Sequence, residues 1–190
     1  MTVESVSVFH RLFDKTYPAL RFLYETVRRQ PWFSQITPTG GIPENLWLGG
    51  GPDYPRDRQF LLDHDIKAVI NIRAEREDDT AFYDAHDINY IRYFVPDVST
   101  PAPEIIEDAV EWITAQTQTG RAVLVHCAKG RGRSATLLAG YLMRAHGLPY
   151  EQAAQLIKSR RQLTKLEDRH RQVLLTWQQA YPGRGDSLSS

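Results

Sequence analysis

The stretch that most constrains this chain runs from Val123 to Leu138 and has the sequence VLVHCAKGRGRSATLL. An apolar run typical of a strand, Ala122 to Val125, leads to a histidine and a cysteine, and a helical pattern begins after five further residues. The intervening loop is basic and rich in glycine, so its backbone N–H groups can turn inward at the positive end of a helix. The stretch therefore predicts a strand, a tight loop and a helix that together bind a tetrahedral anion such as phosphate.

Length and charge limit the class of protein. A chain of 190 residues suits one domain with a full hydrophobic core. Its 23 basic and 23 acidic side chains give a formal net charge of zero, so no global basic excess indicates a nucleic-acid partner. Anion binding must therefore come from a local cluster of cations, and no nucleic-acid partner is expected.

Cys127 is the single cysteine, which excludes an internal disulfide framework and a cysteine-rich metal site. The six histidines show no spacing typical of metal ligands, so neither a metal nor a cofactor is expected. No apolar run approaches the roughly 18 residues that span a bilayer, and the first eight residues lack the basic region of a signal peptide. We therefore expect a soluble, cytoplasmic protein in which the loop thiol is a candidate nucleophile.

Residues 1–34 have apolar side chains at helical spacing, and their basic residues outnumber their acidic ones. One interpretation packs this amphipathic helical segment on the domain, and another lays it on an anionic membrane surface as a peripheral contact. A mitochondrial transit peptide is disfavoured by the acidic residues. Residues 182–190 are expected to form a disordered tail, which leaves residues 35–181 as the domain that carries the cysteine loop.

Apolar runs alternate with helical patterns along that domain. Residues 35–43, rich in threonine, proline and glycine, indicate a connector. The charged run 73–79 is typical of a solvated loop, with substrate recognition as the other interpretation. Strands are expected at 46–48, 68–72, 90–95 and 122–125, and helices over 56–64, 81–86, 104–117, 134–146, 150–158 and 168–181. This alternation predicts an α/β fold with a central, mostly parallel sheet of four to five strands flanked by helices.

Cleavage of a phosphate ester needs an in-line nucleophile, neutralisation of the equatorial oxygens and a proton for the leaving oxygen. Cys127 follows the strand, where loop amides, a helix dipole and Arg133 would lower the thiol pKa from its ordinary value of about 8.5. The planar guanidinium of Arg133 can bind two phosphate oxygens at once. Ser134 can donate a hydrogen bond to the sulfur, cap the helix, or do both. These residues together favour phosphoryl transfer to a cysteine.

The run His126 to Ser134, HCAKGRGRS, resembles the HCx5R signature loop of the cysteine-dependent, dual-specificity phosphatase superfamily. The resemblance implies the protein tyrosine and dual-specificity phosphatase fold and a phosphocysteine intermediate. It assigns the role of general acid and base to Asp97, which lies in a proline-flanked loop after a strand, although an isolated loop aspartate is otherwise a turn former. His126 is then a buried residue that orients the loop. The substrate-binding positions are Ala128, Lys129, Gly130, Arg131 and Gly132.

The resemblance covers about residues 35–178 and includes the segments IPENLWLGG, AVINI and FVPDVSTP. These are similar to the branch of the superfamily that contains the mitochondrial phosphatidylglycerophosphate phosphatase. The branch implies a phospholipid headgroup, phosphatidylglycerophosphate or a phosphoinositide, as substrate, and a mitochondrial location in a eukaryote. The chain departs from the family pattern at Arg161 to Arg171, where the expected Arg-Pro and Gln are absent, so substrate orientation and water positioning stay open there.

Lys129 and Arg131 bear on the substrate independently of the resemblance. Two extra cations at the loop rim suit a substrate with a second phosphate, or one that lies in an anionic bilayer. The alternative is that both face solvent.

Three other functions are open to such a chain. The first is a dual-specificity protein phosphatase acting on phosphotyrosine and on phosphoserine or phosphothreonine. The second is an inactive phosphate-binding module, although such proteins typically lose the cysteine or the arginine that this chain retains. The third is a sulfurtransferase, which has no need of Arg133 and Ser134 at these offsets. A phosphatase of the arsenate reductase type is disfavoured because its cysteine loop follows the first strand, and here about three expected strands precede the loop.

Overall fold

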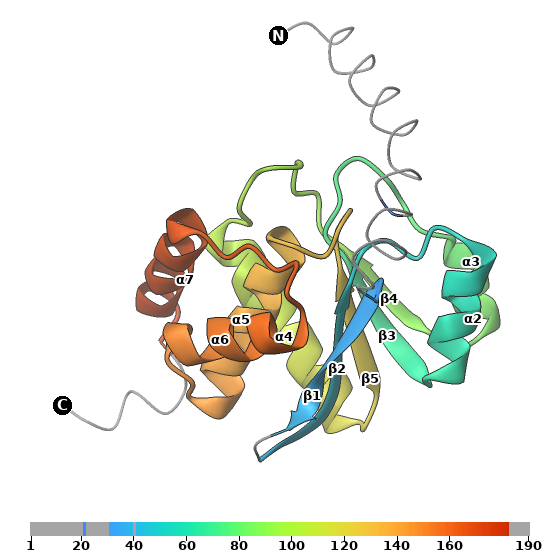
Figure 1. Ribbon diagram of the computed structural model, residues 1–190, viewed down its shortest axis with the longest axis horizontal. Coiled ribbons are helices and arrows are strands. Elements are labelled where there is room, and N and C mark those ends of the chain that lie inside the picture. The colour runs from blue at the N-terminus through green and yellow to red at the C-terminus, as the bar shows by residue number, and fades with distance from the viewer. Residues whose placement is uncertain (1–20, 22–30, 40, 183–190) are drawn as a thin grey trace, which may run out of the picture. The chain divides into compact units, whose positions relative to one another are not determined.

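A computed structural model describes residue 21, residues 31–39 and residues 41–182 (Figure 1). The chain divides into two units, Met1–Phe33 and Ser34–Ser190, and the second carries the cysteine loop. The amphipathic segment expected over residues 1–34 and the tail expected over residues 182–190 lie almost wholly outside the described residues. Within the described residues, no helix combines the length and the apolar character that crossing a bilayer would require.

Five strands form one sheet in the order β1-β2-β5-β3-β4. They are β1 (Phe33–Thr39), β2 (Ile42–Gly49), β3 (Ile66–Asn71), β4 (Asn89–Arg92) and β5 (Ala122–His126). The central strand β5 pairs in parallel with β2 and β3, and β3 pairs in parallel with β4. Every residue of β5 is buried, as expected for a parallel strand covered on both faces. The predicted α/β fold with a mostly parallel sheet is confirmed.

The connector predicted for residues 35–43 is wrong, because β1 occupies most of that range. Thr37 Oγ1 donates to the carbonyl of Glu44 and accepts from the Leu46 N–H at 3.2 Å. The Gln35 side chain donates to Asn45 Oδ1 at 2.8 Å, so side chains on both strands add to the pairing. β1 is an edge strand, where a proline is tolerated because its missing N–H is not needed by a neighbour. The threonine and proline content therefore suggested a loop where a hairpin strand forms.

Helices cover both faces of the sheet, in a larger group on one side and a smaller group on the other (Figure 1). The larger group is α4 (Pro103–Gln118), α5 (Arg133–His146), α6 (Tyr150–Arg160) and α7 (Asp168–Ala180), and the smaller is α2 (Pro55–Asp63) and α3 (Thr80–Ala85). All six agree with the predicted helices to within a few residues. In α5, every residue from Arg133 to Met143 is buried, so this helix forms the centre of the larger group.

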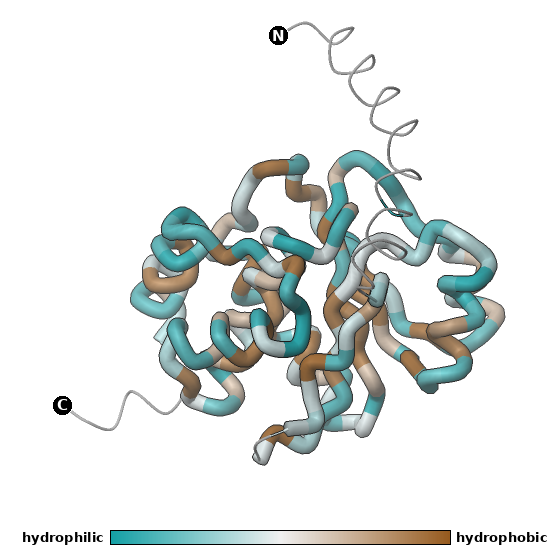
Figure 2. Tube along the Cα trace, in the orientation of Figure 1, coloured by the Kyte–Doolittle hydropathy of each residue, from teal (hydrophilic) through white to brown (hydrophobic). Residues whose placement is uncertain are grey.

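The parallel strands place the functional loops at one end of the sheet. The segments that follow β2, β3, β4 and β5 all leave from carboxyl ends, which in a parallel sheet lie at the same edge. Hydrophobic residues concentrate along the strands and inner helix faces, whereas this edge is largely hydrophilic (Figure 2). The cysteine loop between β5 and α5 therefore lies at the same edge as the charged loop 73–79 and the loop 94–99.

Candidate active site

The cysteine loop, residues 127–132, is held from behind by a buried arginine. Arg161 is almost fully buried, and its Nε donates to the carbonyl of Gly130 at 2.8 Å. Its Nη2 donates to the carbonyl of Lys129 at 3.0 Å. Because these carbonyls point towards Arg161, the N–H groups of the following peptides turn to the opposite side of the loop. Arg161 lies at the start of the segment that departs from the family pattern, and its contact with the loop has no signal in the local sequence.

Two positions of the loop must be glycine because neighbouring atoms lie too close for a side chain. Gly130 has a φ of +62°, and a Cβ there would lie 2.4 Å from the backbone carbonyl of Gly49 at the end of β2. A Cβ at Gly132 would lie 2.9 Å from Nε2 of His170. Both distances are shorter than real Cβ contacts allow, so the backbone of the loop packs directly on its neighbours.

The Cys127 thiol is buried at the start of this loop, and Ser134 Oγ donates to its sulfur at 3.3 Å. Burial by itself would raise the pKa of the thiol. The charge of Arg133, the Ser134 hydroxyl and the backbone N–H groups of Ser134 and Arg131 outweigh that effect and lower the pKa below its ordinary value. The arrangement therefore favours a thiolate, which is the nucleophilic form.

Arg133 is oriented by a bidentate ion pair with Glu75. Its Nη1 and Nη2 donate to the two carboxylate oxygens at 2.9 and 2.7 Å, and Nη1 also donates to the carbonyl of Val95 at 2.7 Å. Burial of Glu75 would raise its pKa, but the hydrogen bonds and charge of Arg133 lower it below the usual value. Glu75 therefore stays ionised and fixes the plane of the guanidinium.

Asp97 lies in the acid loop, which we define as residues 94–99, and it contacts Arg133 directly. Its Oδ1 accepts from Arg133 Nη2 at 2.9 Å, while 43% of its side chain is exposed. Asp97 thus accepts a hydrogen bond from a guanidinium N–H group that could otherwise bind a phosphate oxygen. The structure brings Asp97, Cys127 and Arg133 to the same pocket.

His126 is fully buried beneath the cysteine, and its Nε2 contacts Asp78 Oδ2 at 2.7 Å. The same carboxylate accepts from Arg73 Nη2 at 2.6 Å and from the Tyr83 hydroxyl at 2.8 Å. Although burial would raise the pKa of Asp78, His126 and Arg73 lower it far below the usual range. Only 2% of the Arg73 and Asp78 side chains is exposed.

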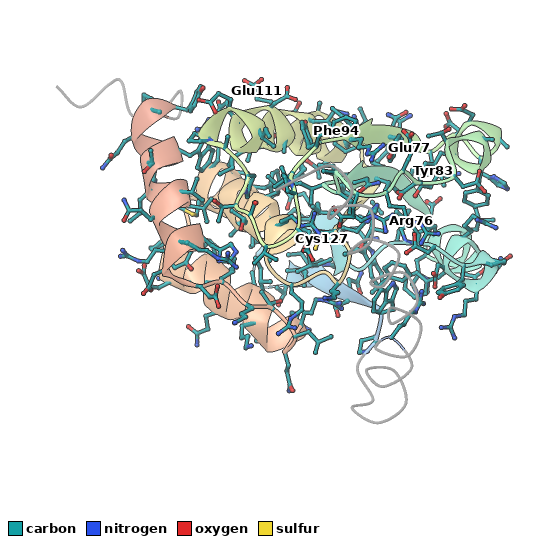
Figure 3. The ribbon with its side chains drawn as sticks, turned by 90° about the horizontal axis from the view of Figure 1, so that it is seen from above. Arg76, Glu77, Tyr83, Phe94, Glu111 and Cys127 are labelled. Atoms are coloured by element: carbon teal, nitrogen blue, oxygen red, sulfur yellow. The ribbon has the colours of Figure 1, made fainter. Side chains whose placement is uncertain are left out.

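The expectation that the charged run 73–79 is a solvated loop is therefore wrong for Arg73, Glu75 and Asp78. Glu75 and Asp78 turn inward because the cysteine loop and its flanking residues present cationic or N–H donors to them. Arg76 and Glu77 do remain about half exposed. Figure 3, which looks onto this end of the molecule, labels both of them together with Tyr83 and Cys127. The inward carboxylates of Glu75 and Asp78 therefore support Arg133 and His126 on either side of the cysteine loop.

A pocket of about 170 Å³ opens above Cys127 and is strongly cationic. Three segments line it: the acid loop through Asp97, Val98 and Ser99; the cysteine loop and the first residue of α5 through Cys127, Lys129, Arg131, Gly132 and Arg133; and the segment around the start of α7 through Lys165, Arg169 and His170. Of the predicted substrate-binding positions, Ala128 and Gly130 are not among the lining residues. Lys129, Arg131 and Gly132 are.

The three residues near α7 were missed by the sequence analysis. The Lys165 N–H donates to the carbonyl of Arg131 at 3.0 Å, and Arg169 donates to the carbonyl of Val98. His170 Nδ1 accepts from the Glu167 N–H at 2.9 Å, so its Nε2 faces Gly132 and the pocket. Burial, together with the charge of Arg169, lowers the pKa of His170 and keeps it neutral. The signal available in the sequence was the basic run from Arg161 to Arg171, whose position relative to the pocket depends on the fold.

Comparison with known proteins identifies related chains. A model of the dual specificity phosphatase catalytic domain matches residues 46–180. Human phosphatidylglycerophosphatase and protein-tyrosine phosphatase 1 is 27% identical over 156 residues, covering 75% of this chain and 75% of that protein. Dual specificity protein phosphatase 1 from Arabidopsis thaliana is 29% identical over 128 residues, covering 63% of this chain and 59% of that protein. The crystal structure of PTPMT1 in complex with PI(5)P has a TM-score of 0.68 at 23% identity, covering 79% of this chain and 96% of that one.

Proposed function

Because the chain belongs to the dual-specificity phosphatase family, we propose that this cysteine-dependent phosphatase acts on a phospholipid headgroup, with phosphatidylglycerophosphate as the first candidate and a phosphoinositide as the second. The observation that carries the lipid assignment is the cationic wall of the pocket. Besides Arg133, the wall contains Lys129 and Arg131 from the cysteine loop, Lys165 from the segment before α7 and Arg169 from the start of α7.

In the proposed reaction, the Cys127 thiolate attacks phosphorus in line with the leaving oxygen. The S–P bond forms as the bond to the leaving oxygen breaks, and a protonated Asp97 supplies the proton that this oxygen needs. Arg133 and the inward N–H groups of the loop bind the equatorial oxygens, where negative charge is concentrated. The lowered pKa of the thiol supports this assignment, because it increases the fraction of thiolate, which is the nucleophilic form.

The second step returns the enzyme to its starting state. Water attacks the phosphocysteine, Asp97 accepts a proton from the water, and the S–P bond breaks to release inorganic phosphate. The Ser134 hydroxyl donates to the departing sulfur and stabilises the thiolate that forms. When substrate binds to Arg133, the Asp97 carboxylate must release Nη2. The carboxyl group then lies beside the bound phosphate, where it can transfer a proton.

The cationic wall favours a substrate with more than one anionic group. Phosphatidylglycerophosphate carries a phosphodiester in addition to its phosphomonoester, whereas a phosphotyrosine side chain has one phosphate alone. Lys165 and Arg169 each pair with Glu167, at 2.6 and 3.0 Å, but exposed pairs of this kind are weak and do not prevent contact with a ligand. The phosphatidylglycerophosphatase name of the human relative and the PI(5)P bound in the PTPMT1 complex support the same substrate class.

The second candidate is a dual-specificity protein phosphatase, which the name of the Arabidopsis relative supports. A substrate panel separates the two functions. The purified full chain should release phosphate from phosphatidylglycerophosphate with a kcat/KM more than about tenfold above that for phosphotyrosine and phosphothreonine peptides, a difference of about 1.4 kcal/mol. Cys127→Ser should abolish turnover of every substrate. The opposite ranking of lipid and peptides would refute the lipid assignment and leave the phosphatase chemistry intact.

A further inference from the structure

Two large hydrophobic side chains flank the acid in the acid loop and face solvent. Phe94 is 68% exposed and Val98 is 71% exposed, and they are the exposed large hydrophobics of the described part of the chain. Asp97 lies between them in the sequence, and Val98 itself lines the pocket. Single exposed apolar side chains are ordinary, but a pair confined to the loop beside a catalytic pocket indicates a binding surface.

The backbone at Val98 adds independent weight. Its φ is +66°, in the left-handed region that a β-branched residue rarely adopts. Glycine or asparagine would adopt this conformation with less strain, and a mostly exposed valine gains little burial in return. Arg169 donates a hydrogen bond to the Val98 carbonyl and so holds the loop in this conformation. The protein therefore has an apolar side chain at position 98, although glycine or asparagine would make the folded state more stable.

Phe94 is held in place by a neighbouring cation. The Arg92 guanidinium lies 4.4 Å from the centre of the Phe94 ring, and its Nε donates to the carbonyl of Arg73 at 3.0 Å. Arg92 also pairs with Glu77 at 3.3 Å. Figure 3 looks onto the end of the molecule that carries Phe94 and Cys127, and Figure 2 shows hydrophobic colour on the acid loop at this otherwise hydrophilic end.

The charge beside these apolar residues is positive. Lys129, Arg131, Lys165 and Arg169 line the pocket together with the acid Asp97, and Glu167 pairs with Lys165 and Arg169. The whole chain has no net charge, so this cationic rim is a local concentration. Apolar side chains bordered by Lys and Arg are the combination that binds an anionic lipid surface, since the former enter the acyl boundary and the latter contact headgroup phosphates.

We propose that the acid loop docks on a membrane that contains anionic lipid, with Phe94 and Val98 entering the boundary between headgroups and acyl chains. The cationic rim then contacts neighbouring lipid phosphates, and the pocket opens towards the membrane. This docking rests on the proposed lipid substrate, because it would bring a membrane-borne phosphomonoester to Cys127 without extraction of the lipid. It also couples the position of Asp97 to the membrane, since the acid and both apolar residues share one short loop.

The single cysteine of the chain allows a direct test. In the full chain with Cys127→Ser, we would introduce Phe94→Cys, Val98→Cys or, as the matched control on α3, Phe82→Cys, and label each with a polarity-sensitive fluorophore. Vesicles of phosphatidylcholine with phosphatidylglycerol should shift the emission to the blue at positions 94 and 98 and leave position 82 unchanged. Chain that sediments with these vesicles without a shift at 94 or 98, or chain that does not sediment with them, would overturn the docking proposal.

Turnover separates docking from substrate chemistry. Phe94→Ser should lower kcat/KM for phosphatidylglycerophosphate in vesicles by roughly tenfold, as expected for loss of a partly buried aromatic ring. It should leave unchanged the turnover of a short-chain, water-soluble form with the same headgroup, and Phe94→Leu should retain most of the vesicle activity. If the wild type hydrolyses phosphopeptides better than the short-chain lipid, the proposed function fails. If Phe94→Ser slows phosphopeptides alone, the loop is a peptide-docking surface and the membrane proposal is refuted.

Discussion

The carboxylate of Asp78 offers the sharpest test of how the cysteine loop is supported. It accepts hydrogen bonds from Arg73, Tyr83 and Asn71 and contacts His126, all within 3.0 Å. Asp78→Asn keeps the shape of the side chain and removes its charge. The amide would also place a donor against groups that already donate, so at least one of them loses its acceptor.

The expected cost follows from the burial of this network. Arg73 retains Asp53, whose carboxylate oxygens lie 3.2 Å from its guanidinium, so the arginine is not left without a counter-charge. His126 and Tyr83 have no such second partner among the described hydrogen bonds. Removing one member of a buried charged network costs about 3–5 kcal/mol of unfolding free energy. For a domain of this size, each kcal/mol lowers the Tm by about 2–4 °C.

Urea denaturation and thermal melting of the purified variant would measure this loss. Asp79→Asn is the matched control, because Asp79 is the exposed neighbour that caps α3 and asparagine is an equally good cap. Its expected effect is below about 0.5 kcal/mol. Equal effects of the two substitutions, or a loss below about 1 kcal/mol for Asp78→Asn, would refute the claim that the buried network supports the loop.

The pH dependence of the stability of the wild type and of Asp78→Asn provides a second measurement. The pKa of Asp78 is lower in the folded protein than in the unfolded chain, where it is about 3.9. Its stabilisation is therefore fully present above that pH and is lost only as the pH falls further, through the folded value. The difference in stability between wild type and Asp78→Asn should be constant from neutral pH to about pH 5 and shrink in stronger acid.

Three further predictions concern the site itself. Asp97→Ala should slow hydrolysis of substrates with poor leaving groups by about 10²–10⁴-fold and have much less effect on p-nitrophenyl phosphate. It should also tighten inhibition by vanadate, because Arg133 Nη2 no longer donates to the Asp97 carboxylate and is available to the inhibitor. Ser134→Ala should raise the pKa of Cys127, seen as a shift to higher pH in the midpoint of alkylation by iodoacetamide, and an unchanged midpoint would contradict the assigned hydrogen bond. Arg161→Met should lower the free energy of unfolding by about 1–3 kcal/mol, because two loop carbonyls lose their donor. It should also lower kcat in steady-state assays. A fall in stability with kcat unchanged would show that the loop keeps its shape without this arginine.

Much of the fold was predictable because its signals are local. The apolar run of β5 and the helical pattern of α5 follow from short windows of sequence, and the structure has both where they were expected. Strand β1 was missed since its composition is typical of a loop and its pairing depends on β2. An edge strand contributes few buried apolar residues, so the periodic signal that reveals an internal strand is weak there.

The site divides in the same way between local and distant contacts. Cys127, Arg133 and Ser134 lie within eight consecutive residues, in the cysteine loop and the first turn of α5, so their proximity follows from the motif. Glu75 reaches Arg133 across 58 residues, and Asp78 reaches His126 across 48. A run of charges has no periodic feature that distinguishes a buried carboxylate from a solvated one, because the distinction depends on partners supplied by other elements.

The cysteine loop also suggests how proteins of this kind can diverge. Its backbone approaches β2 at Gly130 and His170 at Gly132, leaving no room for a side chain at either position. Lys129 and Arg131 alternate with these glycines and line the pocket. Mutation at the two basic positions would therefore alter which ligands are attracted, while the amides that surround the sulfur keep their places. Selection can in this way change the substrate of such an enzyme and conserve its reaction.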